Sequence, residues 1–332
     1  MLLAVTLAPE GRPASAVAGP GAALHHHQGT RLSMATVYAI EAWGPDETGL
    51  AAAVEAAFDE VDRIDRLMSH YRSDSPLSRI NREAALHPVP VDRELFDFLA
   101  AAIGYTRASG GAFDVTVGPL MKAWGFFRGD GSLPSQADVA AALRHVGATH
   151  VLLDAASRTV AFDGPGVELD LGGIAKGYAV DRAAGVLRAR GVAAALVSSG
   201  GSTIYAMAAP PGRAGWPVDI QDPLRGATIA RTLRLKNRAL SVAGTSEKFF
   251  ERAGVRYSHI MDPRSGWPVQ GVLSVAVLAP TGTAGDALDD ALFVLGPERS
   301  RGYLATLTGV EAFFFLPDVG RQWRLVHRRG RT

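Results

Sequence analysis

The sequence predicts an α+β fold in which mixed sheets are flanked by helices. Patterns typical of strands and helices follow one another in mixed order, without the regular alternation of a doubly wound α/β sheet. No fixed-period repeat that would indicate a solenoid or a propeller is visible. The 332 residues, 47% of them hydrophobic, can bury a large core without disulfides or a structural metal. We expect residues 29–330 to form one large domain or two interlocked subdomains.

The first 28 residues are set apart from this domain. Small residues and prolines between Met1 and Ala23 resemble a degraded export signal, but no Lys or Arg precedes the apolar stretch. We expect segment 1–28 to be disordered or processed, and we therefore discount the histidine tract at its end, residues 25–27, as a metal site. This ambiguous start leaves the cellular location open.

Five helices are predicted from apolar periodicity and capping signals. From Leu50 to Met68, apolar residues recur every three or four positions, which indicates one buried helical stripe. Ser135 and Asp138 have near capping-box spacing at the start of another helix. This helix is predicted over residues 135–146, and the three others over residues 92–108, 175–190 and 286–295.

Short strands are predicted mainly after residue 150. Residues 150–154 and 158–162 indicate a hairpin, and residues 236–238 indicate a turn between two later strands. Residues 111–127, rich in glycine and aromatics, are predicted to connect two helices. The other predicted strands are 167–170, 193–198, 228–235, 239–242 and 272–278, followed by a closing hairpin of 311–316 with 322–326.

Composition excludes several classes of function. The 34 Lys and Arg nearly balance the 33 Asp and Glu, and they are scattered along the chain, which argues against dedicated nucleic-acid binding. The absence of cysteine excludes disulfides, thiolate metal sites and cysteine nucleophiles. No apolar run approaches the roughly 20 residues of a spanning helix, so we expect no membrane-spanning segment.

A glycine-rich turn from Asp170 to Gly177 lies where a predicted strand gives way to a helix. Glycines there let the backbone approach a ligand, the helix N-terminus offers N–H groups to an anion, and Lys176 adds a positive charge. The segment matches neither of the common nucleotide-binding glycine motifs. Taken alone, it is more often an ordinary turn with a solvated lysine.

Three carboxylates, those of Asp286, Asp289 and Asp290, are spaced to lie on one face of an otherwise apolar helix. Like charges at this spacing repel, and hard oxygen donors grouped in this way suit Mg²⁺. An acidic first turn favoured by the helix dipole explains the same pattern. From these residues alone, the two interpretations are about equally supported.

Two further segments could contribute to a ligand site. His259 lies in a turn-dense segment that ends at Gly266, where it could act as a general base, although a lone histidine is more often structural. The segment from Ala112 to Phe126 combines aromatics, backbone donors and the carboxylate of Asp114, which suits a planar ring with polar edges. The alternative for this segment is a hydrophobic plug between helix and sheet.

Taken together and in order, these segments resemble the ApbE-type FAD:protein FMN transferases, a family also called flavin transferases. The resemblance extends from about Met34 to Gly296, and several spaced motifs in one order are far more specific than any single motif. The motifs are Met68-Ser69 with Asp74 to Asn81, Ala112 to Leu120 with Trp124-Gly125-Phe126, Asp170 to Gly177, Ser258 to Gly266, and Asp286 to Gly296.

This resemblance implies an ApbE-like, T-fold-related architecture of mixed sheets or a barrel flanked by helices. It also implies Mg²⁺-dependent transfer of the FMN half of FAD to a Thr or Ser hydroxyl of a partner flavoprotein, with release of AMP. Members of the family usually act outside the cytoplasmic membrane. The alternatives are an FAD pyrophosphatase that gives FMN and AMP, and a flavin-binding protein without turnover.

The resemblance also assigns residues to roles. His259 is implied as the group that activates the incoming hydroxyl. Mg²⁺ is implied to be held by the backbone carbonyl of Gly173 and by Asp286, Asp289 and Asp290. FAD is implied to be held by Met34, Tyr71, Ala112, Phe113, Asp114, Asp170, Lys176 and Ile260.

The chain departs from the family pattern at three places. Asp290 stands where threonine is usual, and Ala35 where glycine is frequent. Ser202 and Thr203 follow the paired glycines at a position where an acidic residue is common.

Overall fold

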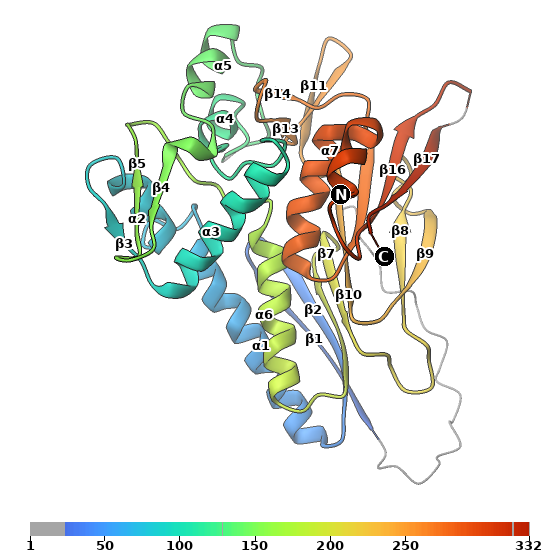
Figure 1. The fold of residues 1–332 in the computed structure, drawn as a ribbon. Helices are drawn as coiled ribbons and strands as arrows, with labels where there is room; N and C mark the ends of the chain where they lie inside the picture. Colours follow the sequence, from blue (N-terminus) through green and yellow to red (C-terminus); the bar gives the residue numbers. More distant parts are fainter. Residues whose placement is uncertain (1–23, 128, 321, 332) are drawn as a thin grey trace.

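An eight-stranded antiparallel sheet runs through the molecule (Figure 1). The structure, a computed structural model, describes residues 24–127, 129–320 and 322–331. Among these residues β1 and β17 are the outer strands, so the sheet is open and not a closed barrel. In spatial order the strands are β1 (His25–Ser33), β2 (Thr36–Gly44), β6 (Ala194–Ser199), β7 (Thr203–Met207), β10 (Arg238–Gly244), β15 (Ser274–Ala279), β16 (Glu311–Pro317) and β17 (Trp323–Arg329).

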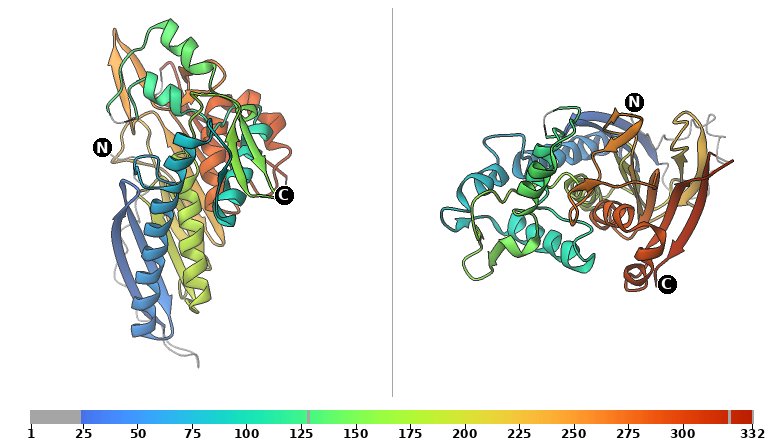
Figure 2. Two further views of the ribbon diagram at one scale, coloured as in Figure 1. Left: turned by 90° about the vertical axis from the view of Figure 1, so that its left-hand side faces the viewer. Right: turned by 90° about the horizontal axis from the view of Figure 1, so that it is seen from above.

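Three long helices pack against one face of this sheet (Figures 1 and 2). They are α1 (Glu47–Met68), α6 (Ala175–Ala189) and α7 (Gly282–Leu304). The apolar stripes of α1 and α6 share one core with β2 and β6, and α7 packs mainly on β10 and β15. None of the helices in the described part of the chain combines the length and apolar character that a membrane crossing requires.

The opposite face is covered by a separate hairpin, β8 (Trp216–Gln221) with β9 (Ile229–Leu235). Its inward side chains, among them Trp216 and Leu235, pack on Phe313 and Phe315 of the large sheet. Both faces of the sheet are therefore buried near its centre, which explains why β6, β10 and β15 are apolar along most of their length.

A side lobe lies beside the sheet in the view from above (Figure 2, right). It contains most of the segment between α1 and α6. Two short hairpins, β11 with β12 and β13 with β14, lie close to its outer end (Figure 1). The elements of the lobe are α2 (Pro76–Glu83), β3 (Val89–Pro90), α3 (Arg93–Ala108), α4 (Gly118–Ala123), α5 (Gln136–Leu143), η1 (Ala148–His150), β4 (Val151–Asp154) and β5 (Thr159–Phe162). The hairpins are β11 (Phe249–Arg252) with β12 (Val255–Ser258), and β13 (Met261–Asp262) with β14 (Trp267–Pro268).

The predicted α+β class and all five predicted helices are confirmed. The capping signals explain the accuracy of two helix starts, since Asp92 accepts from Leu95 N at 2.7 Å and Ser135 forms a complete capping box with Asp138. Helix α7 extends beyond the predicted apolar run, from Gly282 to Leu304, with a break at Gly296. The short helices α2 and α4 were not predicted from the sequence.

The predicted strand 167–170 does not form. The side chain of Asn81 brackets this segment instead, donating to Leu169 O at 2.9 Å and accepting from Leu169 N at 2.8 Å. Val167 and Leu169 are buried and alternate with more exposed residues, which is typical of a strand. However, Leu169 pairs with the Asn81 side chain, and Asp170 N donates to Val115 O at 2.7 Å outside any strand.

The predicted turn between the strands at 228–235 and 239–242 is present at residues 236–237. The two strands do not pair with each other, because β9 pairs with β8 and β10 with β7 and β15. One further expectation needs correction. Strand β1 begins at His25, so residues 25–28 belong to the sheet and not to a disordered segment. The expectation for residues 1–23 lies outside the described residues.

Candidate active site

A cavity of about 730 Å³ brings together segments that are far apart in the sequence. It is lined by the β1–β2 turn, the end of α1, the loop before α4, the glycine turn before α6, the loop after β10, the residues after β12 and the start of α7. Every residue that the sequence assigns to the site lines this one cavity. These are Met34, Tyr71, Ala112, Phe113, Asp114, Asp170, Gly173, Lys176, His259, Ile260, Asp286, Asp289 and Asp290.

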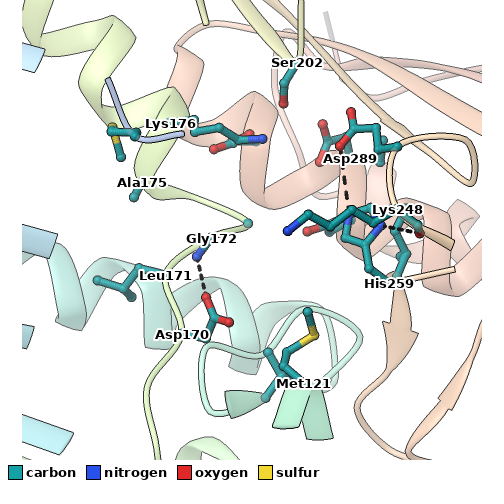
Figure 3. A pocket seen from close by; sticks show the side chains of 18 of the residues that line it. Met121, Asp170, Leu171, Gly172, Ala175, Lys176, Ser202, Lys248, His259 and Asp289 are labelled. Atoms are coloured by element: carbon teal, nitrogen blue, oxygen red, sulfur yellow. Dashed lines mark hydrogen bonds and ion pairs between the residues drawn. The ribbon is translucent and has the colours of Figure 1, made fainter. Parts of the chain in front are cut away.

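The glycine turn lies directly against the acidic start of α7. Asp170 Oδ1 accepts from Gly172 N at 2.8 Å, which closes the turn (Figure 3). A Cβ at Gly173 would lie 2.5 Å from Asp290 Oδ2, so the backbone of the turn passes close to this carboxylate. Gly177 N donates to Asp286 Oδ2 at 2.8 Å. The glycine turn and the start of α7, to which the resemblance assigns the Mg²⁺ ligands, are therefore in contact.

The aspartates of α7 are held by hydroxyl groups of the sheet. Asp286 and Asp289 are 2% and 4% exposed. Thr203 Oγ1 donates to Asp286 Oδ1 at 2.9 Å, and Ser241 Oγ donates to Asp289 Oδ2 at 2.6 Å. The two hydroxyl oxygens are themselves 2.8 Å apart. The carboxylates are thus anchored from the sheet side of the helix.

Negative charge is concentrated at this end of the cavity. Burial raises the pKa of Asp286, and burial together with Asp290 raises the pKa of Asp289 well above its ordinary value. Burial and the neighbouring Asp286 raise the pKa of Asp290 to about 7. Carboxylates that lie close together in a buried site are more stable when they bind a cation or take up a proton than when all of them are ionised and unpaired.

Two lysines, Lys176 and Lys248, face the cavity. Their amino groups point into it from opposite sides (Figure 3). Burial alone would lower the pKa of Lys176, but the carboxylates of Glu247 and the three aspartates more than offset it and raise the pKa. Lys176 is therefore a cation at neutral pH beside the acidic cluster, as a phosphate-binding role requires.

The residues present fit a hard divalent cation in charge and donor type. The carboxylates of Asp286, Asp289 and Asp290 offer the oxygen ligands that Mg²⁺ prefers, and the Gly173 backbone lies next to Asp290. In residues 24–127, 129–320 and 322–331, no three His, Cys, Asp or Glu side chains are already arranged as a full ligand set. Mg²⁺ commonly completes its shell with water and substrate phosphate oxygens, so three ready side-chain ligands are not required.

His259 enters the cavity from the opposite side to the glycine turn (Figure 3). Its Nδ1 lies 3.2 Å from the carbonyl oxygen of Lys248, and its Nε2 lies 3.9 Å from Glu247 Oε2. Burial lowers the pKa of His259 below its ordinary value, although Glu247 acts in the opposite direction. The imidazole is therefore neutral at pH 7 and able to accept a proton.

The two halves of the segment from Ala112 to Phe126 have different surroundings. Ala112, Phe113 and Asp114 line the cavity, as expected. Trp124 and Phe126 do not face it, because they are fully buried in a cluster with Leu120 and Met261, where Trp124 Nε1 donates to Gly266 O at 2.8 Å. The plug interpretation is therefore correct for the second half of the loop.

Several cavity residues were missed by the sequence reasoning. Glu247 and Lys248 lie in the loop after β10, and no motif marked them. His70, beside the predicted Tyr71, lies with Nδ1 3.3 Å from Asp170 Oδ1 and its ring centroid 3.9 Å from that of Tyr71. Only the proximity of His70 to the Met68-Ser69 motif could have indicated it.

The turn that carries Met34 is strained by its side chains. Met34 and Ala35 have φ values of 49° and 58°, in the left-handed region that favours glycine. The family pattern with glycine at position 35 would relieve this strain, so the methyl group of Ala35 has a backbone cost here.

Comparison with known proteins gives a consistent result. The model of the ApbE family matches residues 34–314. A protein of Treponema pallidum (strain Nichols) named FAD:protein FMN transferase is 36% identical over 282 residues, which are 80% of this chain and 78% of that protein. A protein of the same name from Klebsiella pneumoniae (strain 342) is 33% identical over 265 residues, or 79% of this chain and 82% of that protein.

Solved structures agree with these relatives. An ApbE protein of Thermotoga maritima superposes with a TM-score of 0.81 at 30% identity, covering 92% of this chain and 97% of the other. The apo form of a Pseudomonas stutzeri flavinyl transferase superposes with a TM-score of 0.78 at 31% identity, covering 92% and 95%.

Proposed function

Since this chain belongs to the ApbE family, we propose that it transfers the FMN half of FAD to a Thr or Ser hydroxyl of a partner flavoprotein in a Mg²⁺-dependent reaction. The observation that carries the proposal is the meeting of the glycine turn, the acidic start of α7 and His259 in one cavity. The charge of a dinucleotide diphosphate needs cationic partners, and a transfer to a hydroxyl needs a nearby base.

The diphosphate would lie over the glycine turn. The ammonium of Lys176, in the first turn of α6, provides positive charge for its oxygens. Asp286, Asp289, Asp290 and the Gly173 carbonyl would hold Mg²⁺, whose charge would be available to neutralise phosphate oxygens. Phe113, which lines the cavity, and Tyr71, stacked near Phe127 at its edge, offer surfaces for planar rings.

In this proposal, His259 takes the proton of the acceptor hydroxyl. The carbonyl oxygen of Lys248 can only accept a hydrogen bond, so Nδ1 carries the hydrogen in the neutral ring and Nε2 keeps its lone pair. The hydroxyl proton passes to Nε2, the hydroxyl oxygen bonds to the phosphorus of the FMN half, and the bond from that phosphorus to the bridging oxygen breaks. AMP leaves with the bridging oxygen. Glu247, 3.9 Å from Nε2, stabilises the imidazolium that forms.

The decisive experiment is an incubation of the purified chain with FAD, Mg²⁺ and a flavoprotein that carries a Thr or Ser flavinylation site. We expect covalent flavin fluorescence on the acceptor and equimolar AMP. Free FMN and AMP without labelling would instead establish the pyrophosphatase, and unchanged FAD would establish a flavin-binding protein without turnover. Asp286→Ala, which removes a carboxylate from the cluster, is expected to abolish labelling, and normal activity in this variant would contradict the metal assignment.

A further inference from the structure

Two buried hydroxyls face each other across neighbouring strands of the sheet. Thr203 of β7 and Ser241 of β10 are register partners, and both are fully buried. Their oxygens are 2.8 Å apart. Polar groups in such a place persist only when they have partners, because an unpaired buried hydroxyl is costly.

Each hydroxyl also contacts a different carboxylate of α7. Thr203 donates to Asp286 and Ser241 donates to Asp289, at 2.9 and 2.6 Å. Gly285 allows this approach, because a Cβ there would lie 3.1 Å from Ser241 Cβ. Aspartates one helical turn apart are therefore matched by hydroxyls on two adjacent strands.

We propose that Thr203 and Ser241 are positioning residues that set the orientation of Asp286 and Asp289 for the divalent cation. This inference rests on the cation assignment of the proposed function. In the described part of the chain, neither hydroxyl side chain is among the groups that line the cavity, so both act through the carboxylates.

The chemistry of a hydroxyl suits this task better than that of a charged side chain. A lysine or arginine at either position would orient the carboxylate but neutralise it, and would compete with the cation. A hydroxyl donates one hydrogen bond and leaves the negative charge available. Groups that hold metal ligands in this way typically change metal affinity by roughly 10–100-fold when removed.

The test measures Mg²⁺ binding to the full chain by titration calorimetry without FAD, with Mn²⁺ and electron paramagnetic resonance as a second probe. Thr203→Val keeps the shape but removes the hydroxyl, and Ser241→Ala does the same for the second position. We expect each to weaken Mg²⁺ binding by roughly 10–100-fold. Thr203→Ser, which keeps the hydroxyl, is expected to retain most of the affinity.

Ser274→Ala is the matched control. Ser274 lies in β15 of the same sheet, is 2% exposed and donates to Ala243 O at 3.0 Å, without contact to an aspartate. This variant should lose stability but keep Mg²⁺ affinity. Because Thr203 and Ser241 contact each other, the double variant should lose less affinity than the product of the single losses.

Two results would overturn the inference. One is a folded hydroxyl-deletion variant, Thr203→Val or Ser241→Ala, that binds Mg²⁺ as tightly as the unaltered chain. The other is an unaltered chain that binds no Mg²⁺. Intact Mg²⁺ binding that depends on both hydroxyls, together with no FMN transfer, would support this inference while contradicting the proposed function.

Discussion

His259 shows how one residue acquires a role from its surroundings. Its Nδ1 faces a backbone carbonyl and its Nε2 faces the cavity near Glu247, so one nitrogen is committed to orientation and the other is left for chemistry. Burial keeps the ring neutral under ordinary conditions by lowering its pKa. Sequence alone could place His259 in a turn but could not assign these two roles.

His259→Ala is expected to slow FMN transfer by roughly 10²–10⁴-fold, the range for loss of a general base, with little change in FAD affinity. In the unaltered chain at saturating Mg²⁺, transfer should fall on acidification only below the ordinary histidine pKa of 6.5, because the folded-state pKa of His259 is lower. Single-turnover rates and FAD titrations across pH measure both effects. His87→Ala, on an exposed loop, is the control. Equal loss of FAD binding and transfer would make His259 a structural residue.

Asp290 supplies a second residue-scale prediction. Its pKa of about 7 means that a proton competes with the cation near neutrality. Mg²⁺ affinity should therefore weaken as the pH falls through about 7, and Asp290→Asn, which cannot take up that proton, should show a shallower dependence. Calorimetric Mg²⁺ titrations of the unaltered chain and of Asp290→Asn at pH values around 7 measure this difference. Parallel pH dependences in the two forms would show that another group titrates.

At the scale of elements, α6 and α7 touch through two glycines. A Cβ at Gly177 would collide with Gly282 O, and a Cβ at Gly282 would lie 2.6 Å from Gly177 O. This close crossing brings Gly177 N to Asp286 and so places the acidic helix start against the glycine turn. The small residues of two helices thus determine a distance in the cavity.

Gly177→Ala is expected to destabilise the fold by about 1–3 kcal/mol, the usual cost of overpacking, and to weaken Mg²⁺ binding. Gly185→Ala in the same helix is the control. A Cβ there meets nothing within 4 Å, so this change should be neutral or stabilising by about 0.5–1 kcal/mol. Urea denaturation measures both. A Gly177→Ala variant as stable as the unaltered chain would contradict the close crossing.

The elements also show where sequence reasoning succeeds. Helices with a clear apolar stripe or cap, such as α1 and α5, were predicted because their signals are local. Segment 167–170 has the composition of a strand but pairs with Asn81, which lies far away in the chain. The residues of the cavity could be predicted from spaced motifs, whereas Glu247 reaches the site only through tertiary folding.

At the scale of the whole molecule, ion pairs connect the side lobe to the long helices. Arg63 of α1 donates to Glu60 and to Glu94 of α3 at 2.8 Å each, and Arg182 of α6 donates to Glu60 at 2.9 Å. Hydrogen bonds from Arg63 are the first cause that lowers the pKa of both glutamates below the ordinary 4.5. The network therefore depends on both carboxylates being ionised.

A glutamate with a lowered folded-state pKa stabilises the fold above its unfolded value and loses this contribution as the pH falls through the folded value. We therefore expect the melting temperature to drop on acidification below about pH 4.5. Arg63→Met should lower the melting temperature at neutral pH and reduce this acid-dependent drop. Arg93→Met, at an exposed pair with Asp97, is the control. An unchanged acid profile for Arg63→Met would remove the network as its cause.

The order of strands in the large sheet could not be predicted from the sequence. β2 pairs with β6, although more than a hundred residues separate them, because long-range pairing depends on which apolar faces can be covered together. Local patterns indicate that strands exist, but they carry no information about partners. The open sheet with α1, α6 and α7 on one face therefore became known only from the structure.

The residues that line the cavity are spread along most of the chain, from Met34 to Val294, and this affects biosynthesis. Its earliest residues follow β1 and its latest lie in α7, so a growing polypeptide exposes an unfinished wall until α7 has been made. Flavin capture cannot precede release of α7 from the ribosome, and any prematurely terminated product lacking that helix would be unable to hold the nucleotide.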